Sequence, residues 1–238
     1  GFSDDQIMGL IQPIEFDTRN IGNPWINYGN YLMTTLIPAM IAFIVVMHSI
    51  YVIARERKER TVKSWLRKAN GNTLIAIIGK ELPYTVWYSL LCLIANFIMF
   101  GPMGYPLEGS WMLMVVNTLL LIIAAQSVGI FIGACIPDPP FAMSIGAIYS
   151  AMSFTFSGFS FPVESMPPAF TAVSWLYPIR QYFLSYSDIA IFGNGFEHCW
   201  PHFAIMMLFW LLPLVGAAML YWQQKQEQKK PKPNTEKP

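Results

Sequence analysis

One short pattern in this 238-residue chain resembles a nucleotide-binding motif. Gly79-Lys80 matches the end of the phosphate-binding loop GxxxxGK[ST]. However, Leu74 stands where that loop needs its first glycine, and Glu81 stands where a hydroxyl group must hold magnesium. The sequence therefore predicts that this chain does not bind ATP through this motif.

Histidines and cysteines are the side chains that could bind a transition metal here. His198 and His202 have the i,i+4 spacing of a zinc pair on a helix, but a proline lies between them and no third ligand is evident. Cys92, Cys135 and Cys199 show neither metal-ligand nor disulfide spacing. We expect no metal site, no catalytic residues and no cofactor bound by this chain.

Long stretches without a charged side chain dominate the rest of the sequence, which is 54% hydrophobic and 12% charged. A helix needs about 20 apolar residues to cross about 30 Å of hydrocarbon, and a charge at mid-bilayer costs about 2.5 to 3.5 kcal/mol. These stretches predict an all-α, polytopic membrane protein. The predicted spans are 31–53, 83–100, 111–132, 141–161 and 203–222.

The basic residues predict the orientation of these spans. Eight of the fifteen Lys and Arg residues lie between Arg55 and Lys80, and five lie between Lys225 and Lys237. Cytoplasmic loops carry the excess of Lys and Arg, so both clusters should face the cytoplasm. Residues 1–30 would then be the end of an extracytoplasmic domain, and 223–238 a disordered basic cytoplasmic tail.

The predicted spans contain little that could move ions. His48 is their only ionisable side chain apart from thiols and phenols, so a proton or sodium relay is disfavoured and energy should come from a partner. Gly129 and Gly133 form a GxxxG pattern, which favours close helix packing within the chain over a dimer contact.

A short amphipathic helix is predicted in the basic loop between the first two spans. Its apolar positions recur at i, i+3, i+4 and i+7, and Asn70-Gly71-Asn72 ends it. Anchoring to anionic lipid and docking to a partner explain this helix about equally well. The apolar positions are Val62, Trp65, Leu66 and Ala69.

An interrupted apolar segment follows the fourth span on the predicted outer side. Prolines can begin a short helix at 167–168 and a second one at 178, giving two re-entrant helices in the outer leaflet that cap the bundle. An ion pair between Glu164 and Arg180 is predicted there. The cap residues are Phe161, Pro162, Glu164, Pro167, Pro168 and Arg180.

Several short stretches together resemble the membrane subunit of type-two ABC (ABC-2) exporters, and most closely the bacterial drug-efflux branch. The resemblance covers nearly the whole chain. It is carried by Arg55-Glu56 with Thr61, Gly79-Lys80 with Pro83-Tyr84, Ser157-Gly158-Phe159, FPVESMPP at 161–168, and Asn23-Pro24 with Pro38.

The resemblance implies a permease of six spans, of which this chain would hold the second to sixth and lack the first. It implies a multi-pass protein of the bacterial inner membrane, with its first residues outside and its C-terminus cytoplasmic. ATP and Mg would bind a cytoplasmic ABC ATPase subunit. Further implied partners are a second permease copy or paralogue, a periplasmic adaptor protein and membrane lipid, but no nucleic acid.

By the same resemblance, residues 55–72 would include the helix that docks on the ATPase. Family members commonly have Gly before the Thr and an acidic residue two positions after it, whereas this chain has Arg60 and Lys63, so its docking surface should be more basic. The implied coupling residues are Arg55, Glu56, Arg60, Thr61, Lys63, Trp65, Arg67 and Lys68.

The predicted function is export of a lipophilic or amphiphilic substrate, such as a drug or lipid, out of the cytoplasm or inner leaflet. Apolar walls with few charges favour such a cargo. A membrane scaffold or assembly component without transport activity is the alternative. By resemblance, the substrate path would be lined from the first and fourth predicted spans by Met40, Phe43, Met47, Phe154 and Phe156.

Overall fold

A computed structural model describes residues 28–158 and 165–229 of the chain. Every regular element in these two ranges is a helix, so the all-α prediction is confirmed. The α-helices are α2 (Tyr28–Lys58), α3 (Val62–Lys68), α4 (Thr73–Phe100), α5 (Trp111–Cys135), α6 (Pro139–Phe156), α7 (Pro168–Ser174), α8 (Pro178–Tyr186), α9 (Phe196–Leu208) and α10 (Leu212–Lys229). A π-turn, η2 (Ser187–Ile191), follows α8, and a 3-10 turn, η3 (Phe209–Leu211), joins α9 to α10.

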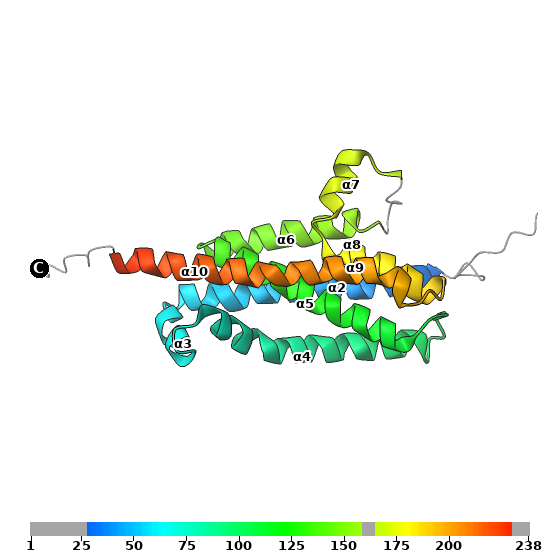
Figure 1. Cartoon of the computed structure of the whole chain (residues 1–238), viewed down its shortest axis with the longest axis horizontal. Coiled ribbons are helices and arrows are strands. Elements are labelled where there is room, and N and C mark those ends of the chain that lie inside the picture. The colour runs from blue at the N-terminus through cyan, green and yellow to red at the C-terminus, as the bar shows by residue number, and fades with distance from the viewer. Residues whose placement is uncertain (1–27, 159–164, 230–238) are drawn as a thin grey trace, which may run out of the picture.

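The long helices run side by side along the molecule, with α3 at one end and α7 projecting from the bundle toward the other (Figure 1). Helix α5 packs against α2, α4, α6, α8, α9 and α10 and forms the centre. In the most apolar stretch of α5, 72% of the residues are buried, compared with 22% in the corresponding stretch of α4. An apolar face as open as that of α4 needs lipid or another protein chain against it.

Glycines let α5 approach α2 closely. A Cβ atom at Gly129 would lie 2.5 Å from the carbonyl oxygen of Val46, and one at Gly133 would lie 3.1 Å from that of Ile50. Only residues without a side chain fit the first of these contacts. The GxxxG pattern therefore packs two helices within this chain, as the sequence predicts.

Four helical stretches in the described residues are long and apolar enough to cross a membrane. They are α2, α4, α5 and the continuous stretch from α9 into α10. Helix α6 corresponds to the predicted span 141–161 but is not among these four. The count of five spans stays a prediction.

Capping residues explain where helices begin. The Asn72 side chain accepts hydrogen bonds from the backbone N–H groups of Leu74 and Ile75, so α4 begins at Thr73 and contains the whole predicted span 83–100, whose bounds stay a prediction. At the other end of the chain, α10 continues to Lys229. Residues 223–229 are therefore helical rather than part of a disordered tail; 230–238 lie outside the described residues, as do 1–27 of the predicted extracytoplasmic domain.

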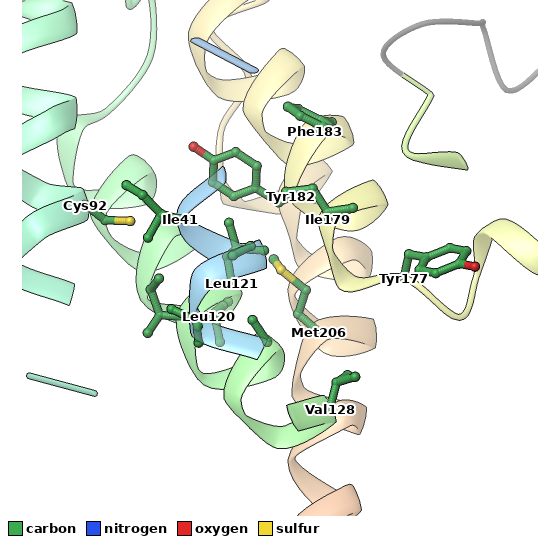
Figure 2. Close-up of a cluster of buried hydrophobic side chains, with 14 of the residues drawn as sticks. Ile41, Cys92, Leu120, Leu121, Val128, Tyr177, Ile179, Tyr182, Phe183 and Met206 are labelled. Atoms are coloured by element: carbon green, nitrogen blue, oxygen red, sulfur yellow. The ribbon is translucent and has the colours of Figure 1, made fainter. Parts of the chain in front are cut away.

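The main buried cluster lies where α8 meets the centre of the bundle. Figure 2 shows Tyr182 and Ile179 of α8 beside Leu121 of α5, with Met206 of α9 next to them. Tyr182 and Met206 are almost completely buried. The second short helix predicted from its leading proline is thus part of the core of this fold.

Candidate functional site

The basic loop folds into a short helix, as predicted. Helix α2 ends at Lys58, the chain turns through Arg60, which has a φ of 56°, and α3 follows. Leu66 is buried, whereas the three cations of α3, Lys63, Arg67 and Lys68, are exposed. The amphipathic pattern therefore places apolar side chains against the bundle and cations on its surface.

An ion-pair cluster fixes α3 to two long helices. Lys80 of α4 pairs with Glu56 of α2, and its ammonium group also donates to the carbonyl oxygen of Val52 at 3.1 Å. The Thr61 hydroxyl donates to Glu56, and the Lys80 ammonium lies 5.3 Å from the centre of the Trp65 ring. We call Glu56, Thr61, Trp65 and Lys80 the coupling cluster; a movement of α3 would be passed to both α2 and α4.

The remaining predicted coupling residues divide into two groups. Arg55 pairs with Glu59 at 2.7 Å on an exposed face of α2. Arg60 and the cations of α3 point outward, so they are available to a partner. The structure thus brings Glu56, Thr61 and Trp65 together and leaves the cations as an exposed surface. A polar cleft of about 590 Å³ lies beside the coupling cluster.

Sequence reasoning missed two residues that organise this end of the bundle. In the sequence, Lys80 belongs only to an incomplete phosphate loop and to a weak family motif, yet it is the centre of the coupling cluster. Arg57 donates to the carbonyl oxygen of Ile136 at 2.7 Å and to Gln223 Oε1 at 2.6 Å. It therefore ties α2 to the end of α5 and to α10, a contact that no local spacing reveals.

A carboxyl group is buried next to the coupling cluster, which corrects the prediction that His48 is the only such ionisable group. Glu81 lies within α4 rather than in the loop before it, and its side chain is 4% exposed. Ser49 Oγ and Gln126 Nε2 donate to its Oε2 atom at 3.0 and 3.2 Å. Gln126 in turn accepts from Thr85 Oγ1 at 2.7 Å. This buried hydrogen-bonded group joins α2, α4 and α5 one residue after Lys80.

The predicted cap is described in part. Prolines begin α7 and α8 as predicted, and Arg180 is buried with its guanidinium 4.5 Å from the centre of the Trp175 ring. Pro167 precedes α7 as its N-cap residue, and Pro168 is the first residue of that helix. Phe161, Pro162 and Glu164 lie outside the described residues, so the predicted pair between Glu164 and Arg180 stays a prediction, as does the re-entrant position of these helices.

The two histidines near the cap lie in different surroundings. Helix α9 continues through Pro201, and His202 Nδ1 lies 2.9 Å from Gln181 Oε1, while His198 is exposed. In the two described ranges, no group of three or more His, Cys, Asp and Glu side chains is placed to hold a metal ion. His202 instead connects α9 to α8.

Three of the five predicted substrate-path residues line one apolar groove between α2 and α6. Met40, Phe43 and Phe154 lie in this groove, which has a volume of about 390 Å³. Met47 instead packs against α6 near Gly146. Phe156 stacks on Tyr177 with a distance of 5.8 Å between ring centres, so it belongs to the packing of the cap.

A larger apolar cavity was not predicted. It has a volume of about 640 Å³ and lies among α5, α6 and the α9–α10 junction, where Tyr149, Trp175 and Phe209 contribute to its walls. Aromatic and aliphatic linings of this kind suit a lipophilic ligand. No spacing in the sequence indicates it, since its walls come from segments far apart in the chain.

Comparison with known proteins gives a consistent result. A family described as "ABC-2 family transporter protein" matches residues 4–219. The chain is 31% identical over 107 residues to the inner membrane transport permease YhhJ of Escherichia coli (strain K12), which covers 45% of this chain and 29% of that protein. It is 24% identical over 183 residues to the probable multidrug ABC transporter permease YbhS of the same organism, covering 76% and 48%. The chain thus spans less than half the length of these relatives.

Proposed function

The chain belongs to the ABC-2 family of transporters, and on that premise we propose that it is the membrane-spanning permease part of an ATP-driven exporter. It would perform no bond chemistry itself. ATP and Mg would bind a separate cytoplasmic ABC ATPase, and a second permease, identical or paralogous, would complete the transport path. The end of the bundle that carries α3 would face the cytoplasm of a bacterial inner membrane.

One observation carries this proposal: α3 presents exposed cations on one side and is fixed to α2 and α4 by the coupling cluster on the other. When two ATPase subunits close on ATP, they would displace α3. Because Lys80 holds α3 and the adjacent Glu81 holds Ser49 and Gln126, this displacement would reach α2, α4 and α5 together. Such a movement would open a path toward the outside.

The proposed substrate is lipophilic or amphiphilic. The groove containing Met40, Phe43 and Phe154 and the cavity at the α9–α10 junction are both almost entirely apolar, so they favour a drug-like or lipid-like molecule over a charged or sugar substrate. YbhS is named as a probable multidrug ABC transporter permease, which agrees with this class.

The test uses the complete permease co-expressed with its candidate ABC ATPase. Reversing two exposed charges of α3, Arg67→Glu and Lys68→Glu, should weaken docking of the ATPase by about 1.4 kcal/mol or more. This loss corresponds to at least about a tenfold decrease in the amount of co-purified ATPase. The control Lys58→Glu/Lys225→Glu makes the same charge change at exposed residues outside α3. It should leave co-purification unchanged.

The scaffold alternative makes a different prediction. A scaffold would bind no ATPase, and cells lacking it would accumulate lipophilic dyes no faster than cells that contain it. If no ATPase co-purifies with the unmodified permease, or if the α3 variant behaves like its control, the exporter proposal is wrong.

A further inference from the structure

A second polar groove lies at the end of the bundle that carries α3, on the side away from the coupling cluster. It has a volume of about 800 Å³. Its walls come from the end of α2, the following turn, α3, the turn after α5, and the end of α10; Figure 1 shows α3 and the C-terminal end of α10 at the same end of the molecule. The lining residues used below are Arg57, Arg60, Lys63, Trp222, Gln223 and Gln226.

The groove is basic. Three of its lining side chains are cations, and its lining contains no acidic side chain. Arg57 is oriented by carbonyl oxygens at the end of α5 and by Gln223. Arg60 and Lys63 are exposed and have no ion pair among the residues that the structure describes. Such a convergence of cations from separate segments attracts an anion.

The turn at Arg60 brings this side chain to the groove. Its φ of 56° lies in the left-handed region, which glycine adopts freely and arginine adopts only at a cost in energy. This residue ends α2: the Thr61 N–H donates to Glu56 O at 2.9 Å and the Arg60 N–H donates to Arg57 O at 3.1 Å. Arg60 and Lys63 are also the two positions at which the sequence departs from the family pattern, and both line this one groove.

The groove lies where the apolar surface of α10 ends. Tyr221 and Trp222 are both 59% exposed, and the chain continues with Gln223, Gln224 and Lys225. Exposed tyrosine and tryptophan at the end of an apolar stretch favour the headgroup layer of a membrane. The cations of the groove are thus placed at the level of lipid phosphates.

We propose that this groove binds the headgroup of an anionic phospholipid. Arg60 and Lys63 contact the phosphate, the Gln226 amide donates to the headgroup, and the acyl chains follow the exposed apolar side chains of α10. Arg57 positions the walls of the groove rather than the lipid. This inference does not depend on the exporter proposal, since a scaffold with the same groove would bind the same lipid.

The test is a titration of the complete permease in detergent with short-chain phosphatidylglycerol or short-chain phosphatidylcholine, with bound lipid counted by native mass spectrometry. Phosphatidylglycerol should bind about tenfold more tightly. In the variant Arg60→Gly/Lys63→Ala this preference should fall to about twofold or less. The control Lys58→Ala/Lys225→Ala removes two exposed cations from α2 and α10, two helices that border the groove, at positions outside its lining, and should keep the preference.

Three results would overturn the proposal. The first is equal affinity for the two lipids in the unmodified protein. The second is displacement of phosphatidylglycerol by an equimolar amount of inorganic phosphate, which would make the groove a site for free phosphate. The third is a groove variant that keeps the lipid preference; if that variant also loses its ATPase, the groove is assigned to an acidic protein segment. If the double variant fails to fold, Arg60→Gly alone retains the turn and is measured in its place.

Discussion

The end of the bundle around α3 and the region around α8 are both built from short helices between long ones, yet different forces hold them. Helix α3 is fixed by an ion pair and a cation–π contact, and only Leu66 of its side chains is buried. Almost every side chain of α8 is buried, and Ser185 and Gln181 form hydrogen bonds with Asn117 and His202. We therefore expect α3 to be the part that can move and α8 to be the part that keeps its position.

The distinction follows from the physics of the two kinds of contact. An ion pair near the surface is worth about 0 to 1 kcal/mol and can be exchanged for contacts with a partner. A closely packed core has few alternative arrangements, because any shift opens cavities. The following predictions test this difference, from the largest expected effect to the smallest.

Removing a core ring near α8 should have the largest effect. Phe203 is 1% exposed and belongs to the buried cluster that contains Tyr182 and Met206. Phe203→Ala should lower the free energy of unfolding by about 3 kcal/mol or more, since it leaves a cavity. Thermal unfolding in detergent measures this loss. The control Phe97→Ala removes a ring that is 65% exposed on α4 and should change stability far less.

A neutral hydrogen bond in the same region should come next. Asn117 is fully buried, donates to the carbonyl oxygen of Tyr182 at 3.2 Å and accepts from Ser185 Oγ at 2.6 Å. Asn117→Leu should cost about 1 to 3 kcal/mol because buried polar groups lose their partner. Unfolding in detergent again provides the measurement. If this variant is no less stable than Ser144→Ala on the exposed face of α6, hydrogen bonding does not hold α8.

How far the sequence predicts the two regions depends on how local their causes are. The helical period of α3 and the prolines before α7 and α8 are local signals, and the structure contains all three helices. The pairing of Lys80 with Glu56 spans 24 residues, and that of Arg57 with Ile136 spans 79. These pairs depend on how the long helices pack, so no spacing in the sequence predicts them.

The burial of Glu81 also depends on contacts between helices that the sequence does not predict. The charge pattern places the boundary of the second predicted span after Glu81, in the polar loop, because a carboxyl group is costly in an apolar span. The Asn72 cap starts the helix earlier, and Ser49 and Gln126 both donate to Oε2 of the buried carboxyl group. Both donors come from other helices. The sequence therefore predicts the helices well and the polar contacts between them poorly.

The coupling cluster should contribute little to stability. In a double-mutant cycle of Glu56→Gln and Lys80→Met, the coupling energy should be about 1 kcal/mol at low salt and smaller at high salt, because solvent reaches both groups. The exposed pair of Arg55 and Glu59 is the control and should show no measurable coupling. A coupling energy for the Glu56–Lys80 pair as large as the Asn117 effect would remove the contrast between the two regions.

The turn before α3 provides the smallest and most specific test. Arg60 and Asn70 flank α3 and both have left-handed backbones, with φ of 56° and 53°. The left-handed backbone costs an L-amino acid other than glycine about 1 to 2 kcal/mol. Replacement by glycine removes this cost but adds about 0.5 to 1 kcal/mol, because glycine loses more conformational freedom on folding. Arg60→Gly should therefore raise stability by about 0.5 kcal/mol in neutral detergent, measured by thermal unfolding, whereas Asn70→Gly should gain less, since asparagine tolerates this conformation.

Adding phosphatidylglycerol should reverse the order of Arg60→Gly and the unmodified protein. A ligand stabilises the folded form in proportion to its binding, and only the unmodified protein keeps the full set of cations in the groove of α2, α3 and α10. If Arg60→Gly is already less stable without lipid, the arginine side chain holds the turn through contacts within the chain. In that case α3 is held more firmly than the coupling cluster alone explains.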